Sequence, residues 1–514
     1  MTLKRLKSTV QPPGDVPEEG SVAVVGLPKR LAVIAAACSL IAGVVAAPAV
    51  LASGSQQTYL IVYQSRAVPA DAGTRISSAG GTLVARYDAI GVAVATSSSA
   101  TFRASVKADS RIAEAAATSR TAVRLNDDQA TDGTTTPANT PATTSDTLTP
   151  LQWDMIQIHT PEAHVITGGN SSVLVGDIDT GIDFNHPDLA PNVDIANSAN
   201  CVSGAPVPGL AAQDDNGHGT HTAGTIAAAS NGIGIVGVAP NVRIAGIKAG
   251  DAQGFFFPEA VVCAFMWAGD HHVKVTNNSY FADPWLFNCK NDAEQRAIFS
   301  AEQRAIKYAQ SKGVVVVAAE GNQADDLAHP TQDATSPDDT TPVVRDITNA
   351  CAVIPVEVPG VIGVTADGIR SIKSFYSSYG MGTVQVIAPG GDSILQPTTD
   401  IGHGRVLSTW PTGFPCSRLV VDAGASYCYL QGTSMASPHV AGVAALIASQ
   451  HPTWSTGAIT GKITSTADPM ACPDIAQYAF FPATDNGAPQ VCTGGTGYNS
   501  FNGHGQANAW SAVK

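Results

Sequence analysis

Residues 432–439 read Gly-Thr-Ser-Met-Ala-Ser-Pro-His and set one serine, Ser434, among small side chains. An apolar run over 440–447 follows, at a length that fits a helix. Ser434 is therefore expected where a helix begins, where the first N–H groups lack intrahelical partners and the dipole favours negative charge. That position suits a nucleophile whose reaction creates an oxyanion beside it. A helix cap is the commoner role for a single serine, so this motif alone leaves both interpretations open.

Two motifs upstream favour catalysis. Residues 175–181 (Val-Gly-Asp-Ile-Asp-Thr-Gly) end an apolar segment in carboxylates and a turn, and residues 216–221 (Asn-Gly-His-Gly-Thr-His) open an expected helix with a histidine between glycines. A histidine oriented by a carboxylate can take the proton of a serine hydroxyl, which is otherwise a weak nucleophile. Each motif alone has a commoner structural explanation, but three of them in one chain predict nucleophilic catalysis by the serine.

Composition limits the class of protein. The chain has 514 residues, enough for a large core and more than one folding unit. Its formal charge of −14 argues against nucleic acid as a partner, because nucleic acid attracts basic surfaces. Charged residues make up only 14%, which indicates a compact globular body and not a disordered acidic chain.

The first 52 residues are typical of an export signal. Basic residues between 4 and 30 precede an apolar stretch over 31–52, and Val-Leu-Ala at 50–52 offers a small-residue cleavage site. The apolar stretch approaches the length of a membrane span, so a retained anchor is the alternative to a cleaved signal.

A small mixed unit is expected over residues 53–126. Patterns of apolar residues predict strands at 59–63, 82–87 and 91–95 and helices at 72–79 and 100–108, and they leave 111–117 open. Residues 127–149 are rich in Thr, Ala, Pro and Asp, with almost no large apolar side chains, which predicts a flexible linker.

From residue 150 onward, expected strands alternate with expected helices. We expect strands at 172–179, 242–247, 274–279, 314–319, 361–366 and 384–388, and helices at 222–229, 258–268 and 293–312. This alternation predicts a parallel α/β sheet with its ligand site at the carboxyl ends of the strands.

The segment from 151 to 514 resembles the subtilisin-type serine proteases. The order Asp, His, Ser along the chain is the subtilisin order and differs from those of α/β-hydrolases and chymotrypsin. The resemblance implies Asp179, directly before Thr-Gly, as the catalytic aspartate in preference to Asp177. It implies His218 as the general base, Ser434 as the nucleophile, and a structural role for the second histidine of the motif, His221.

The same resemblance implies an oxyanion-binding asparagine. Residues 316–322 (Val-Val-Ala-Ala-Glu-Gly-Asn) match the family segment that ends in it, so Asn322 is expected to act with the Ser434 N–H. Substrate is expected to add as a strand beside the site. The implied substrate contacts are Gly254, Phe255, Ser279, Tyr280, Phe281, Ala318, Ala319 and Glu320. Phe255 is equally compatible with a core position, and Glu320 departs from the small residue usual in the family, so the pocket preference stays open.

Loops and metal ions are the least defined part of the expectation. The segments 325–342 and 398–427 are expected to be loops longer than those of compact family members. No cofactor is expected to be required, although structural calcium is common in the family. Asp214-Asp215 and the acidic loop 325–339 are the candidate calcium ligands, without a spacing that establishes a site.

Eight cysteines lie beyond the export signal, an even number that predicts disulfides in an exported chain. Cys416–Cys428 and Cys472–Cys492 are the expected pairs, because each brackets a short loop rich in turn residues. Cys289–Cys351 is a third candidate, and the last pair stays open. The absence of close C-x-x-C spacing argues against a zinc site.

The expectations combine into a pre-pro-enzyme. The fold class is α/β, a subtilisin-like three-layer fold with a mainly parallel central sheet, preceded by a small α+β unit that resembles the family's inhibitory propeptide. The domains are a signal peptide (1–52), a propeptide (53–126), a linker (127–149) and a catalytic domain (150–514). The expected activity is that of a secreted, monomeric, autoprocessed serine endopeptidase acting on proteins or peptides, with its own propeptide as inhibitor. The alternatives are an esterase and a catalytically silent binding protein on the same fold.

Overall fold

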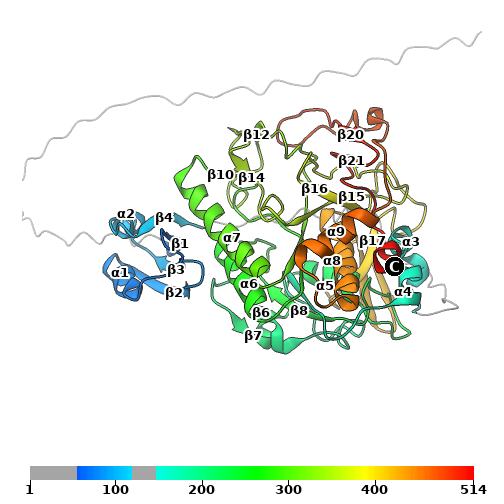
Figure 1. Ribbon diagram of the computed structural model, residues 1–514, viewed down its shortest axis with the longest axis horizontal. Helices are drawn as coiled ribbons and strands as arrows, with labels where there is room; N and C mark the ends of the chain where they lie inside the picture. Colours follow the sequence, from blue (N-terminus) through cyan, green and yellow to red (C-terminus); the bar gives the residue numbers. More distant parts are fainter. Residues whose placement is uncertain (1–54, 119–145) are drawn as a thin grey trace, which may run out of the picture. The chain divides into compact units, whose positions relative to one another are not determined.

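The computed structural model describes residues 55–118 and 146–514 (Figure 1). The expected signal peptide and most of the expected linker lie outside the described residues. In the part of the chain that is described, no helix combines the length and the apolar character that a membrane span requires.

A sheet of eight strands forms the centre of the larger unit, in the order β16-β15-β11-β9-β5-β8-β6-β7. Every neighbouring pair is parallel except β6 with β7 at one edge. The strands are β5 (Leu174–Asp179), β6 (Ala199–Asn200), β7 (Val207–Pro208), β8 (Arg243–Lys248), β9 (Val275–Asn278), β11 (Val315–Ala319), β15 (Ile362–Asp367) and β16 (Val384–Pro389). The prediction of a mainly parallel α/β sheet is confirmed.

Helices cover both faces of this sheet (Figure 1). Helices α5 (His218–Ala227) and α8 (Thr433–Gln450) pack on one face, and α6 (Pro258–Asp270) and α7 (Ala293–Ser311) on the other. The strand pleat divides the core accordingly, because alternate side chains of a strand point to opposite faces. In β11, Val315 and Val317 join the cluster around α8, whereas Val316 and Ala318 join the cluster around α6 and α7. The fold therefore has three layers.

Four shorter helices complete the layer around α8. They are α3 (Trp153–Gln157), α4 (Thr160–Ile166), α9 (Thr456–Thr466) and α10 (Ala509–Val513). Helix α8 itself is buried on all sides from Thr433 to Ala448, which explains why its sequence is apolar with no polar face.

The segment 398–427 differs from the expectation of a loop. It contributes to a three-stranded antiparallel sheet in the order β17-β19-β18, formed by β17 (Val406–Trp410), β18 (Leu419–Asp422) and β19 (Ala425–Leu430). Turn residues and a cysteine interrupt these short strands, so the period of two is weak in the sequence. The segment 325–342 is mostly irregular, as expected. The remaining short strands of the larger unit are β10 (Asn288–Cys289), β12 (Gln332–Asp333), β13 (Arg345–Asp346), β14 (Cys351–Ala352), β20 (Gly494–Gly495) and β21 (Tyr498–Asn499).

The N-terminal segment 55–118 forms a four-stranded antiparallel sheet in the order β2-β3-β1-β4. Its elements are β1 (Gln57–Tyr63), α1 (Ala72–Ser78), β2 (Gly81–Tyr87), β3 (Val92–Ser97), α2 (Phe102–Lys107) and β4 (Ile112–Ala117), so the open segment 111–117 is largely a strand. Tyr59 and Ile61 of β1 pack against α1 and α2, whereas Leu60 and Val62 on the other face join the cluster of α6 and α7.

Residues 146–149, at the end of the expected linker, are folded against the catalytic domain. The buried Asp146 carboxylate accepts the Gly232 N–H at 2.6 Å, and the Leu148 N–H donates to the Gly234 carbonyl at 2.6 Å. The end of the expected linker is therefore part of the folded domain.

Four disulfides cross-link the larger unit: Cys201–Cys263, Cys289–Cys351, Cys416–Cys428 and Cys472–Cys492. Both expected pairs and the third candidate are among them. The pair left open by sequence, Cys201–Cys263, joins the chain after β6 to helix α6.

Candidate active site

Asp179 and His218 meet where strand β5 ends and helix α5 begins. The Asp179 Oδ1 and His218 Nδ1 atoms are 2.7 Å apart, and both side chains are buried. The beginning of α5 lies so close to the turn after β5 that the second position of the helix must be glycine. A Cβ atom at Gly219 would lie 2.2 Å from the Gly181 carbonyl oxygen. The Gly-His-Gly motif therefore serves the packing of α5 on β5 as well as the position of the histidine.

A second carboxylate, Asp214, fastens these two elements together. Its Oδ1 accepts the Thr180 hydroxyl at 3.0 Å from the end of β5, and its Oδ2 accepts the Thr220 N–H at 3.0 Å from α5. The Thr180 hydroxyl oxygen in turn accepts the Gly219 N–H at 2.9 Å. Asp214 is one of the candidate calcium ligands, and its contacts also make it a positioning residue for the Asp179–His218 pair.

Asp177, the other carboxylate of the motif, lies in a different environment. Its two oxygens accept hydrogen bonds from Thr222 at 2.8 Å and from Asn277 at 2.9 Å. Burial, and then the charge of Asp179, hold the pKa of Asp177 well above the usual value. Asp177 is thus bonded to Thr222 and Asn277, whereas Asp179 contacts His218, which supports the preference for Asp179.

His221 has the structural role that the sequence predicts for it. Its Nε2 atom lies 3.0 Å from the Cys428 carbonyl oxygen of β19, and the side chain is fully buried. Burial lowers the pKa of His221 to about 3, so the ring is neutral and holds α5 against β19.

Ser434 is the second residue of helix α8 and is 3% exposed. Its Oγ donates to the Ser279 carbonyl at 3.3 Å, and the Ser279 hydroxyl donates to the Ser434 carbonyl at 2.9 Å. Ser437, one turn later, donates to the Asn277 side-chain oxygen at 2.7 Å. These bonds tie the beginning of α8 to the carboxyl end of β9, where the alternation of elements predicts the site.

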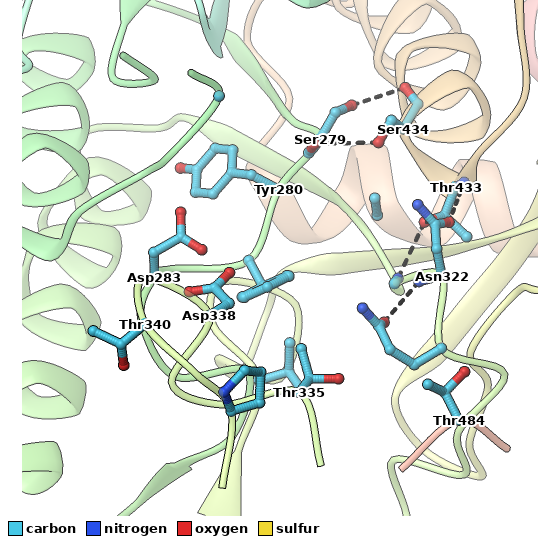
Figure 2. Close-up of a pocket in the computed structure, with 17 residues that line it drawn as sticks. Ser279, Tyr280, Asp283, Asn322, Thr335, Asp338, Thr340, Thr433, Ser434 and Thr484 are labelled. Carbon is cyan, nitrogen blue, oxygen red and sulfur yellow. Dashed lines mark hydrogen bonds between the residues drawn. The ribbon is translucent and has the colours of Figure 1, made fainter. Parts of the chain in front are cut away.

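Asn322 follows strand β11 and faces the same region (Figure 2). Its Oδ1 accepts both the N–H and the hydroxyl of Thr433, each at 2.9 Å. Because the oxygen is committed to Thr433, the orientation of the amide is fixed and its NH₂ group points away from that residue. Sequence reasoning identifies Asn322 but misses Thr433, whose role depends on a contact 111 residues away along the chain.

A cavity of about 380 Å³ adjoins Ser434 and Asn322 (Figure 2). Five of the expected substrate contacts line it: Gly254, Ser279, Tyr280, Phe281 and Ala319.

The other three expected contacts, Phe255, Ala318 and Glu320, do not line the cavity. The Phe255 ring is buried and stacks on Phe257 with 5.7 Å between ring centroids. The Glu320 carboxylate is directed at Gly363 of β15, since a Cβ atom there would lie 2.7 Å from Oε2. Burial raises the pKa of Glu320 to about 8.

Two of the other acidic candidates for calcium have cationic partners. Asp215 forms an ion pair with Lys248 at 2.6 Å, and Asp333 of the acidic loop pairs with Arg345 at 2.5 Å. In the residues that the structure describes, no group of three or more His, Cys, Asp or Glu side chains is arranged to hold a metal ion. A calcium site stays a prediction.

A three-layer α/β fold with an aspartate–histidine pair and a serine at the start of a buried helix has the architecture of a serine hydrolase. Residues 170–505 match the subtilase family, Peptidase S8, and the chain belongs to that family.

Subtilisins and alkaline proteases are similar to this chain over more than 300 residues. The chain is 32% identical over 324 residues to Subtilisin Savinase of Lederbergia lenta, covering 63% of this chain and 93% of that protein. It is equally identical over 324 residues to an alkaline protease of Alkalihalobacillus alcalophilus, and 33% identical over 316 residues to the M-protease of Shouchella clausii. The matched segments cover 63% and 61% of this chain, and 66% and 64% of those two proteins, just under two thirds of their length.

Solved structures show the same fold. The epidermin leader peptide processing serine protease of Staphylococcus aureus (S393A mutant) superposes with a TM-score of 0.64 at 20% identity, covering 89% of this chain and 99% of that chain. Fervidolysin of Fervidobacterium pennivorans superposes with a TM-score of 0.61 at 23% identity, covering 90% and 61%.

Proposed function

We propose that the protein is a secreted serine endopeptidase that hydrolyses peptide bonds through Asp179, His218 and Ser434. The observation that carries the proposal is the 2.7 Å contact between Asp179 and His218 within a domain that belongs to the subtilase family. Ser434 at the beginning of α8 supplies the nucleophile.

The chemistry follows from the roles of these groups. His218 takes the proton of the Ser434 hydroxyl as Oγ attacks the carbonyl carbon, and Asp179 orients the ring and stabilises the imidazolium. The Asn322 amide and the Ser434 N–H donate to the oxyanion of the tetrahedral intermediate. His218 then gives the proton to the leaving amine, and water hydrolyses the acyl-enzyme by the same steps.

Residues 55–118 are proposed to be the inhibitory propeptide of a zymogen. The contacts that support this join them to the catalytic domain. The Arg304 guanidinium of α7 donates to the carbonyls of Tyr63 at 2.9 Å and Ile90 at 3.0 Å, and the Tyr87 hydroxyl donates to the Gly204 carbonyl at 2.6 Å. The enzyme is proposed to cut itself between residues 124 and 149, after export directed by residues 1–52, and to act as a monomer.

The test compares wild type with Ser434→Ala, both expressed in an export-competent, protease-deficient host. Wild type should hydrolyse peptides, react with a fluorophosphonate at Ser434 and lose residues 53 to at least 124. The variant should do none of these while keeping the same fold by circular dichroism. Peptide turnover by Ser434→Ala would refute the mechanism, whereas efficient trimming of an inactive variant would refute self-processing alone.

A further inference from the structure

The cavity beside Ser434 is acidic at one end. Two aspartates, Asp283 and Asp338, line it, and none of its lining residues is a lysine, arginine or histidine. Figure 2 shows the two carboxyl groups together, on the side of the cavity away from Ser434 and Asn322. The cavity therefore presents a negative group at a distance from the proposed nucleophile.

The two carboxyl groups share a hydrogen bond and behave as a pair. Asp283 is 3% exposed, and its Oδ2 also accepts the Phe256 N–H at 2.5 Å. Burial, and then the charge of Asp338, hold the pKa of Asp283 well above its usual value, while burial raises the pKa of Asp338 to about 6. Two carboxyl groups joined by a hydrogen bond share one proton, so the pair carries one negative charge.

The loop that carries Asp338 is tied to the loop that carries Asp283. Its N–H donates to the Pro284 carbonyl at 3.1 Å, and the Ser336 hydroxyl oxygen accepts the Leu286 N–H at 2.8 Å. Asp338 has no ion-pair partner among the described residues, and its buried Oδ1 lacks a hydrogen-bond donor there. A buried acceptor without a donor is costly, and a ligand that brings a donor removes that cost.

The remaining walls suit the stem of a long side chain. Tyr280, Pro342 and Val353 provide apolar surface in the cavity wall. Lysine and arginine side chains bury their methylene stems along apolar surface and carry the charge at the tip. The same cavity offers a phenylalanine or leucine side chain the apolar walls but leaves Oδ1 of Asp338 without a donor.

We propose that this cavity receives the side chain on the N-terminal side of the scissile bond (P1), and that Asp338, supported by Asp283, selects lysine or arginine there. The inference rests on the proposed function, because it takes Ser434 as the nucleophile. Asp338 is a specificity-determining residue in this proposal, and Asp283 is the residue that positions its carboxylate.

The first test measures kcat/KM of the purified secreted enzyme on tetrapeptide p-nitroanilides that differ only at P1. Lysine and arginine should exceed their uncharged counterparts norleucine and citrulline by about tenfold or more. Asp338→Asn should remove that preference, so that its kcat/KM values for the lysine and norleucine substrates lie within about twofold of each other. Asp346→Asn, an exposed aspartate outside the cavity, is the matched control and should behave as wild type.

The second test needs no turnover. Calorimetry should show that benzamidine, a cationic probe of the P1 site, binds wild type and that uncharged benzamide does not. Asp338→Asn should weaken benzamidine binding by about tenfold, whereas Asp346→Asn should not.

The two tests separate the two proposals. Preference of wild type for phenylalanine or norleucine over lysine, with equal binding of benzamidine and benzamide, would overturn the assignment of Asp338 while the peptidase stands. Binding of benzamidine that depends on Asp338, without hydrolysis of any anilide, would support the acidic cavity and overturn the peptidase.

Discussion

The sequence predicts the role of Asn322 but not the contact with Thr433 that orients its side chain. Asn322→Ala removes the amide that is proposed to donate to the oxyanion and leaves the cavity otherwise intact. We expect kcat to fall by about 10²–10³-fold with little change in KM, a magnitude measured for this type of donor on subtilisin, a relative of this chain. Steady-state kinetics on one peptide substrate measures both constants. A change confined to KM would contradict the role.

Burial of the Glu320 carboxyl group makes the folding stability depend on pH. Its folded-state pKa of about 8 lies above the usual 4.5, so the protonated form is favoured by the fold. The contribution of this group to folding stability should therefore be fully present below about pH 4.5 and should be lost as pH rises through about 8. Glu320→Gln removes the titration, and its stability advantage over the parent should grow between pH 5 and 8. The growth should be at most about 1.4 kcal/mol for each pH unit crossed.

The measurement is thermal unfolding across this pH range in the Ser434→Ala background, which prevents self-digestion. Glu294→Gln, at a half-exposed glutamate of α7 that pairs with Arg103 and not with a histidine, is the matched control and should show no such pH-dependent difference. An advantage of Glu320→Gln that is the same at pH 5 and pH 8 would count against the burial of an ionised carboxylate.

The motifs identify a functional residue when its immediate sequence neighbours are enough to distinguish it. Asp179 is preferred to Asp177 because it precedes Thr-Gly, and the structure has Asp179 in contact with His218. Asp214 and Asp338 cannot be assigned in this way. Their partners come from other elements, so their roles exist only once β5 and α5, or two separate loops, are brought together.

At the level of elements, the contact between α5 and the chain that follows β5 leaves no room for an added side-chain atom. Gly219→Ala adds a methyl group where it meets the Gly181 carbonyl oxygen, so α5 has to move away from Asp179. We expect a loss of about 1–3 kcal/mol of stability, together with a clear loss of kcat. Chemical denaturation and peptide hydrolysis check the two effects.

Gly461→Ala is the control for that substitution. Gly461 lies in helix α9, and nothing lies within 4 Å of a Cβ atom added there. The control should keep full activity and gain stability, because alanine favours the helix by about 0.5–1 kcal/mol. Equal behaviour of the two variants would mean that the approach at Gly219 is not tight.

The main strands and helices are predictable from sequence because their apolar patterns are long and regular. Helix α7 is expected at 293–312 and spans Ala293–Ser311. The sheet of β17, β18 and β19 escapes prediction because its strands are short and turn residues separate them. The segment 111–117 stays open because its alanine-rich sequence suits either a helix or a strand, and pairing of β4 with β1 decides it.

At the scale of the whole molecule, Arg304 links the two folded parts of the described chain. Arg304→Ala removes a charged donor from the Tyr63 and Ile90 carbonyls, which leaves two partly buried acceptors without it. A hydrogen bond to a charged donor contributes about 1.5–3 kcal/mol. The segment 55–118 should therefore inhibit the Arg304→Ala enzyme at least about tenfold more weakly than it inhibits wild type. Inhibition constants measured with that segment added to the mature enzyme give the comparison.

Lys307→Ala is the matched control on the same helix, because Lys307 donates to the Pro359 carbonyl within the catalytic domain. Its inhibition constant should equal that of wild type. An unchanged constant for Arg304→Ala would argue that apolar contacts alone hold the two parts together.

The two-faced sheet of residues 55–118 would make the proposed activation difficult to reverse. One face is covered by its own helices, and the other, with Leu60, Val62, Val92 and Val94, shares a core with α6 and α7. Departure from the catalytic domain exposes that second face to water, at about 25 cal/mol for each Å² of apolar surface. A unit of about 60 residues has little stability to lose, so the released segment should unfold and become a substrate itself. In the proposed zymogen, the released inhibitor would then be digested by the enzyme that it had restrained.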